Sequence, residues 1–122
     1  MLSHLPLTPE VLKATYEFLN VTEPFCRWNL PDGDDTIFKI NRSKTMCGWH
    51  DDGDLRLRKP KVIVSLSSHF LKTNRALVET MSHEMCHIHQ FRHFRHEGEH
   101  GPAFQRLADQ VCRAHGFDRG LF

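Results

Sequence analysis

The sequence predicts an α+β domain in which the helices are segregated from a small sheet. Three observations support it: residues with helical spacing lie at both ends of the chain, strand-like alternation fills the middle, and glycine and proline turns separate the segments. The order helix, strands, helix, helix favours an antiparallel or mixed sheet of three to four strands. With 122 residues, 39% of them apolar, the chain suffices for one core, so we expect one domain over residues 1–122.

The first helix is predicted to begin after Thr8. Thr8 is a favourable N-cap, and Pro9 suits the first helical position. Apolar residues then recur with helical spacing from Val11 to Leu19, and Asn20 marks the predicted end. The residues that follow contain two prolines and an Asp-Gly-Asp cluster, which is typical of an irregular connection.

The middle of the chain is predicted to form strands. Thr36 to Asn41 alternates, Thr45 to His50 follows, and Lys61 to Ser67 is the most apolar segment. Residues 51–54 (DDGD) indicate a hairpin-type turn, and a fourth strand is possible around Leu55 to Arg58.

The last third is predicted to be helical. Thr73 or Asn74 can cap a helix that runs to about His96. Pro102 opens a final helix, and Gly116 suits its C-terminal end. The final helix carries one apolar stripe, formed by Phe104, Leu107, Ala108, Val111 and Cys112.

Composition excludes several classes of protein. The formal charge of +1 gives no global footprint for nucleic acid, and no apolar run is long enough to span a membrane. The start of the chain lacks a secretory signal, so we expect a cytoplasmic protein. We also expect a monomer. The four cysteines contain no CxxC pair and are interpreted as reduced, mostly buried thiols: Cys26, Cys47, Cys86 and Cys112.

Residues 83–87 read HEMCH and match the zinc motif HExxH. Two histidines four residues apart lie one helical turn above each other, so both can reach one tetrahedral Zn²⁺. Glu84 lies beside them and can act as the general base that activates a zinc-bound water for attack on a peptide carbonyl. The motif therefore predicts a zincin-like peptidase with one zinc ion, held by His83 and His87.

The helix around the motif has two faces. Its apolar stripe lies roughly opposite His83 and His87, which predicts a helix with one face on a core and the other lining a cleft. The alternative is a solvated polar face that matches HExxH by chance in a chain with ten histidines. The stripe consists of Leu77, Val78, Met81, Met85 and Ile88.

Three candidates compete for the third ligand. His93 fits the metzincin spacing, but that pattern needs glycine where this chain has Gln90, and a continuing helix would turn His93 about 100° away. A gluzincin takes a glutamate from a following helix as its third ligand. Glu97 and Glu99 both precede the last helix, so neither fits that pattern. His100 lies in a loop between two glycines, from which its ring can return to the first two ligands. His100 is therefore favoured, with a capping or surface role as its alternative.

Four segments resemble the SprT-like family of zincin metallopeptidases. Residues 77–87 (LVETMSHEMCH) resemble its active-site helix, and residues 98–104 (GEHGPAF) its loop with the third zinc histidine. Residues 44–49 (KTMCGW) and 62–67 (VIVSLS) resemble two of its strands. The combination of HExxH and HGPxF is specific, and the segments span most of residues 36–117.

The resemblance implies a set of roles and partners. It implies that His83, His87 and His100 are zinc ligands and that Glu84 is the catalytic base. It further implies a protein substrate, often DNA-bound or crosslinked to DNA, activity promoted by DNA, and a nuclear or nucleoid-associated location where the role is DNA-linked.

Cationic residues bear on DNA binding. A basic cluster within residues 56–61 and arginines in the last helices could contact phosphates, although a solvated hairpin is the ordinary explanation. Trp28 and Trp49 could stack on bases, but core packing is the favoured interpretation for both. The cations are Arg56, Arg58, Lys59, Lys61, Arg92, Arg95, Arg106 and Arg113.

Two alternatives to a general peptidase are a non-catalytic, zinc-stabilised module that binds protein or DNA, and a regulatory peptidase specific for one repressor. Glu84 argues against the first, because a structural zinc site needs no general base.

Overall fold

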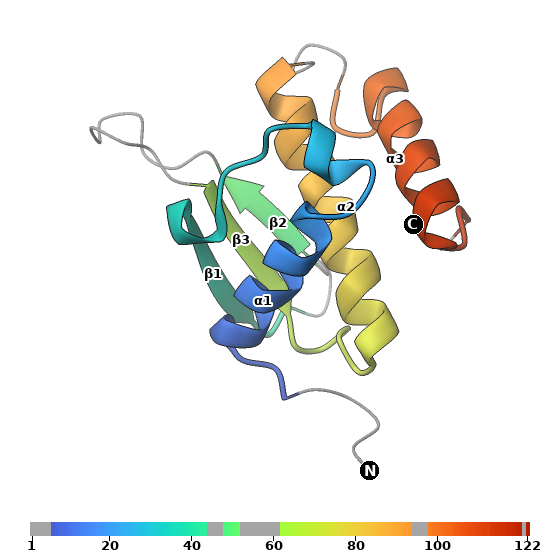
Figure 1. Ribbon diagram of the computed structural model, residues 1–122. Helices are drawn as coiled ribbons and strands as arrows, with labels where there is room; N and C mark the ends of the chain where they lie inside the picture. The colour runs from blue at the N-terminus through green and yellow to red at the C-terminus, as the bar shows by residue number, and fades with distance from the viewer. Residues whose placement is uncertain (1–5, 44–47, 52–61, 94–97, 121) are drawn as a thin grey trace.

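The computed structural model describes residues 6–43, 48–51, 62–93, 98–120 and 122, with residues 48–51 described by their backbone. It confirms the mixed α+β class (Figure 1). Two short 3₁₀ turns, Phe25–Arg27 and Gly33–Asp35, lie between the first helix and the first strand. In chain order the main elements are α1 (Pro9–Asn20), β1 (Thr36–Asn41), β2 (Gly48–Asp51), β3 (Val62–Ser67), α2 (Asn74–His93) and α3 (Pro102–His115).

The sheet is mixed, with strand order β1-β3-β2. β3 lies at its centre, parallel to β1 and antiparallel to β2. β1 has the predicted bounds, and β2 ends one residue later than predicted. β3 is described from Val62, and the predicted first residue, Lys61, lies outside the described residues. The predicted fourth strand and most of the predicted 51–54 turn lie outside the described residues.

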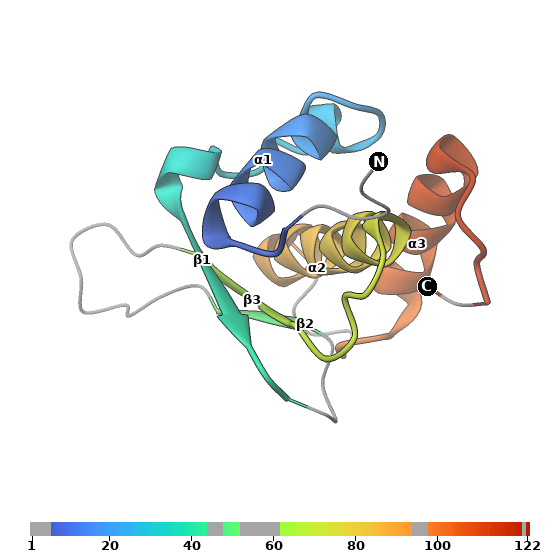
Figure 2. The same cartoon turned by 90° about the horizontal axis from the view of Figure 1, so that it is seen from below.

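The helices cover one face of the sheet (Figure 2). α1 and α2 lie over the strands, and α3 packs against α2. The alternating residues Val62, Val64 and Leu66 of β3 are buried beneath the helices. Because α2 contacts the sheet, α1 and α3, it is the central element of the domain.

α1 begins as the sequence predicts. The Thr8 hydroxyl accepts a hydrogen bond from the Val11 N–H at 3.1 Å. Leu12, Tyr16 and Leu19 form its fully buried face. The Tyr16 hydroxyl donates to the carbonyl of Pro31, so the polar end of this buried ring is satisfied by the irregular connection after α1.

The capping residues of the last two helices also agree with the prediction. The Thr73 hydroxyl accepts from the Ala76 N–H at 3.0 Å, so Thr73 rather than Asn74 is the N-cap of α2. α2 is described to His93, three residues short of the predicted end, and residues 94–97 lie outside the described part. α3 closes at Gly116, which has a left-handed φ of 75°. The predicted stripe of α3 is buried throughout.

Among the described residues, Cys26, Cys86 and Cys112 are free thiols, as predicted, and Cys47 lies outside them. Burial raises the pKa of Cys86 well above its usual value, so its thiol stays protonated. No helix within the described ranges combines the length and apolarity needed to cross a bilayer.

Candidate metal centre

The structure brings together three of the predicted site residues: His83, His87 and His100. One ring nitrogen from each lies within 4.8 Å of the others. The first two come from successive turns of α2, and their Nε2 atoms are 3.1 Å apart. The third comes from the loop before α3, with its ring centroid 4.9 Å from that of His87. The geometry therefore matches the predicted ligand set, while the ligand role itself stays a prediction.

The loop that carries His100 has the predicted glycines at its turns. Gly98 has a φ of 84°, a left-handed conformation that favours glycine. The Gly101 N–H bonds back to the Gly98 carbonyl at 3.4 Å, and Gly101 is the N-cap residue of α3. The Gln105 side chain donates to the His100 carbonyl at 3.1 Å. This tight return directs the exposed His100 toward α2.

Backbone hydrogen bonding orients His83. Its Nδ1 lies 2.6 Å from the backbone oxygen of Phe122. Because that oxygen can only accept, Nδ1 carries the proton and Nε2 keeps its lone pair. Metal-bound histidines use the same arrangement, in which a partner on one nitrogen directs the other at the metal.

His87 is oriented by a side-chain amide. Its Nδ1 lies 3.0 Å from Oε1 of Gln90, and Nε2 of Gln90 donates to the Gly98 carbonyl. With Nδ1 as donor, the Nε2 atom of His87 also presents a lone pair.

The two facing nitrogens test whether zinc fits. Two lone pairs 3.1 Å apart repel each other unless a cation lies between them. Two histidine nitrogens on a tetrahedral zinc are separated by about 3.3 Å, given Zn–N bonds near 2.0 Å. His83, His87 and His100 therefore fit a three-histidine zinc site, a donor set that leaves the fourth position open.

The polar face of α2 is more enclosed than predicted. We expected His83 and His87 to line a cleft, but His87 is only 2% exposed and Glu84 only 3%. Phe104 of α3 covers His87, with its ring stacked on that of His87 at a centroid distance of 4.5 Å. The difference arises because α3 folds back over α2, which helical periodicity alone does not reveal.

Burial also shapes the electrostatics of the site. Desolvation lowers the pKa of His83, although the nearby Glu84 carboxylate and the Phe122 oxygen act in the opposite direction. A neutral imidazole is the form that binds a metal ion. The predicted base, Glu84, is the next residue in α2, and its charge acts on His83. Its catalytic role remains a prediction.

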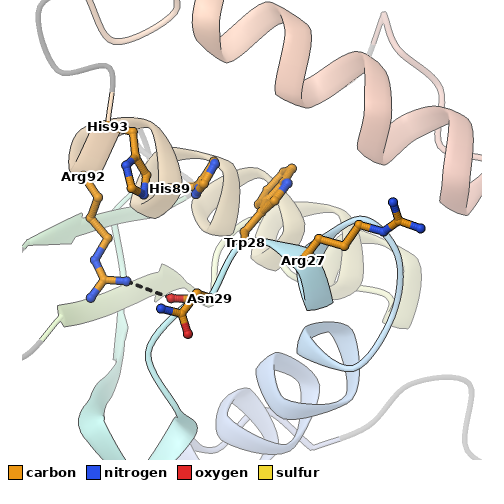
Figure 3. A pocket seen from close by; sticks show the side chains of 6 residues that line it. All are labelled: Arg27, Trp28, Asn29, His89, Arg92 and His93. Carbon is orange, nitrogen blue, oxygen red and sulfur yellow. Dashed lines mark hydrogen bonds between the residues drawn. The ribbon is translucent and has the colours of Figure 1, made fainter.

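His93, which the sequence disfavours as third ligand, lies in a different cluster (Figure 3). Its ring centroid is 4.7 Å from that of His89, and the His89 ring stacks on Trp28 at 4.7 Å with an interplanar angle of 11°. These residues line an open pocket of about 460 Å³ together with Arg27, Asn29 and Arg92. Trp28 is 9% exposed and belongs to the hydrophobic core, as expected.

Sequence reasoning missed three neighbours of the site. Gln90 was considered only as the residue that replaces a glycine, although its spacing of three from His87 puts both on one helix face. Phe104 was assigned to the core stripe of α3, and it both belongs to that core and covers His87. Phe122 is 39 residues from His83, so no local pattern could have revealed its contact.

Comparison with known proteins agrees with these features. Residues 16–120 match the SprT-like family, which covers nearly the whole chain. No curated protein and no solved structure matches the chain significantly. The matched range includes the sheet, α2, the His100 loop and α3. This protein belongs to the SprT-like family.

Proposed function

We propose that the chain is a zinc-dependent endopeptidase. The observation that carries the proposal is the group of three histidines, two of which have their Nε2 lone pairs directed at one point by hydrogen bonds on Nδ1. Glu84, buried beside the first of them, supplies a carboxylate that a purely structural metal site would not need. Family membership supports the same assignment.

The proposed chemistry divides between the metal and the chain. His83, His87 and His100 would hold the zinc, which when bound supplies Lewis-acid polarisation. Glu84 accepts the proton of the attacking water and returns it to the departing amine, as a general base and then a general acid. The Phe104 ring shields this face of α2 from water, which strengthens the electrostatic interactions inside.

We further propose a protein substrate, with DNA as a partner. The support for DNA is electrostatic: Arg27 and Arg92 lie on one open pocket and provide cations for phosphate contact (Figure 3). Arg27 is partly neutralised by Glu23, 2.7 Å away, so the charge of this surface is modest. The basic cluster predicted within residues 56–61 lies outside the described part.

The direct test is Glu84→Gln. Cleavage of fluorescent casein, with and without a single-stranded oligonucleotide, should fall by about 10²- to 10⁴-fold, because the proton acceptor is lost. Zinc content, measured by mass spectrometry of the native protein, should stay at the wild-type level, since the three histidines are intact.

Glu10→Gln is the matched control. Glu10 is an exposed carboxylate in the first turn of α1, so its loss should leave both cleavage and zinc content unchanged. Undiminished cleavage by Glu84→Gln would remove Glu84 from the mechanism. Stimulation by the oligonucleotide would support the DNA partner, and equal rates would contradict it.

The burial of His87 and Glu84 favours one competing function, a zinc-stabilised binding module. It predicts that a chelator lowers the unfolding temperature while the wild-type chain cleaves neither casein nor itself. Cleavage that a chelator abolishes and added zinc restores would exclude it.

A further inference from the structure

Gln90 is a fully buried polar residue in the last part of α2. Its amide bridges two segments: Oε1 lies 3.0 Å from Nδ1 of His87, and Nε2 donates to the carbonyl of Gly98. A buried amide left without hydrogen-bond partners destabilises the fold, so both contacts matter to the fold. They also involve both segments that carry the predicted metal ligands.

The direction of these hydrogen bonds is fixed by the Gly98 carbonyl. A carbonyl oxygen only accepts, so the NH₂ group of Gln90 must face the loop and its oxygen must face His87. An amide oxygen also only accepts, so His87 must donate from Nδ1. The chain of bonds therefore leaves Nε2 of His87 with its lone pair toward His83.

The same amide holds the loop in place. Gly98 precedes His100 by two residues and has the left-handed φ of 84° that begins the return toward α3. The bond from Gln90 ties the start of this return to α2. One side chain thus links the tautomer of His87 to the position of the loop that carries His100.

We propose that Gln90 is a positioning residue of the metal site, which fixes the tautomer of His87 and the position of the His100 loop. The inference rests on the metal site of the proposed function and not on peptidase activity. The glycine that the metzincin pattern places at this position could make neither contact, because it has no side chain. Partners of this kind on metal-ligating histidines typically raise metal affinity by about 10- to 100-fold.

Two variants separate positioning from simple packing. Gln90→Met has a similar length and helix propensity, but its thioether cannot donate and accepts only weakly, so zinc affinity should fall about 10- to 100-fold. Gln90→Glu keeps an acceptor for His87 and should recover most of that loss, to within about tenfold of wild type. If Gln90 acted only by packing, the buried carboxylate would instead be the more damaging change.

Zinc affinity is measured by competition with a chromophoric chelator, and circular dichroism checks that each variant is folded. Gln110→Met, an exposed change on α3, is the control and should bind as the wild type does. A zinc affinity of Gln90→Met within about twofold of wild type would overturn the proposal, since loss of a positioning partner should cost at least about tenfold.

A second measurement needs no variant. In the zinc-loaded wild-type protein, ¹⁵N NMR should show a proton on Nδ1 of His87 that exchanges with solvent far more slowly than that of the exposed His69. Equal exchange rates would overturn the proposal even if Gln90→Met failed to fold.

Failure of this inference differs from failure of the proposed function. A wild-type chain that binds zinc and cleaves nothing would overturn the peptidase while leaving the role of Gln90 intact. A chain that cleaves, with unchanged zinc affinity in Gln90→Met, would overturn only the role of Gln90. A wild-type chain that binds no zinc would overturn both.

Discussion

Helix α2 carries two pairs of histidines with the same spacing and different surroundings. In the first pair, His83 and His87, the Nε2 atoms face each other at 3.1 Å, and hydrogen bonds hold both Nδ1 atoms. In the second pair, His89 and His93, the ring centroids are 4.7 Å apart, and the first ring stacks on Trp28. Among the described residues, only the first pair is joined by another histidine in a group of potential metal ligands.

Helical spacing brings two imidazoles together in both pairs, but the residues packed against each pair determine whether it can bind a metal ion. Burial, assisted by electrostatic repulsion from His93 and Arg92, lowers the pKa of His89 to about 4. Arg27 and Arg92 line the same pocket and oppose a bound cation. At the first pair, by contrast, the nearby Glu84 carboxylate favours positive charge.

Trp28→Ala should have the greatest effect of the predicted changes, and that effect is on stability. It tests whether the second pair of histidines is independent of the first. Trp28 is 9% exposed, stacks on His89 and meets Phe25 edge-on, so its loss should lower the free energy of unfolding by about 3–5 kcal/mol. Urea unfolding of the metal-free protein measures this change. Zinc affinity of the folded variant should change by less than about twofold, because Trp28 contacts His89 and Phe25, which lie outside the group of three histidines at the site.

Trp28→Phe is the matched control for that change. It keeps an aromatic ring against His89 and should recover much of the lost stability. A folded Trp28→Ala protein with zinc affinity reduced tenfold or more would show that the two clusters are coupled, and the contrast between them would fail.

His100→Ala should have the second-largest effect, which is a loss of zinc affinity. Removing one of three ligands should weaken zinc binding by more than about 100-fold, since loss of a ligand's hydrogen-bond partner alone costs up to that much. Chelator competition measures it. His69→Ala, which removes an exposed histidine after β3, should bind as wild type. Wild-type affinity in His100→Ala would require a different third ligand.

Most of the secondary structure could be predicted because its signals are local. Thr8, Pro102 and Gly116 act within one helical turn, and the structure uses each at the predicted place. The parallel pairing of β1 with β3 could not be chosen in advance, because it depends on a crossover that brings residues 26 positions apart into register.

The candidate site shows the same division. HExxH fixes His83 and His87 by helical geometry, and the glycines around His100 indicate a tight return, so the three histidines could be named from sequence. The enclosure of the site by Phe104 and the contact with Phe122 depend on how α3 and the residues after it fold back. That tertiary arrangement leaves no periodic signal in the chain.

The smallest expected effect comes from His93→Ala, and it tests the contrast most directly. The metzincin spacing assigns His93 as third ligand. If that assignment held, His93→Ala should weaken zinc binding as much as His100→Ala does. In the structure α2 stays helical through His93, and this exposed ring meets His89 instead. Zinc affinity should therefore change by less than about twofold, and the free energy of unfolding by less than about 0.5 kcal/mol. Paired chelator and urea titrations check both values, and a loss comparable to that of His100→Ala would reverse the assignment of the two clusters.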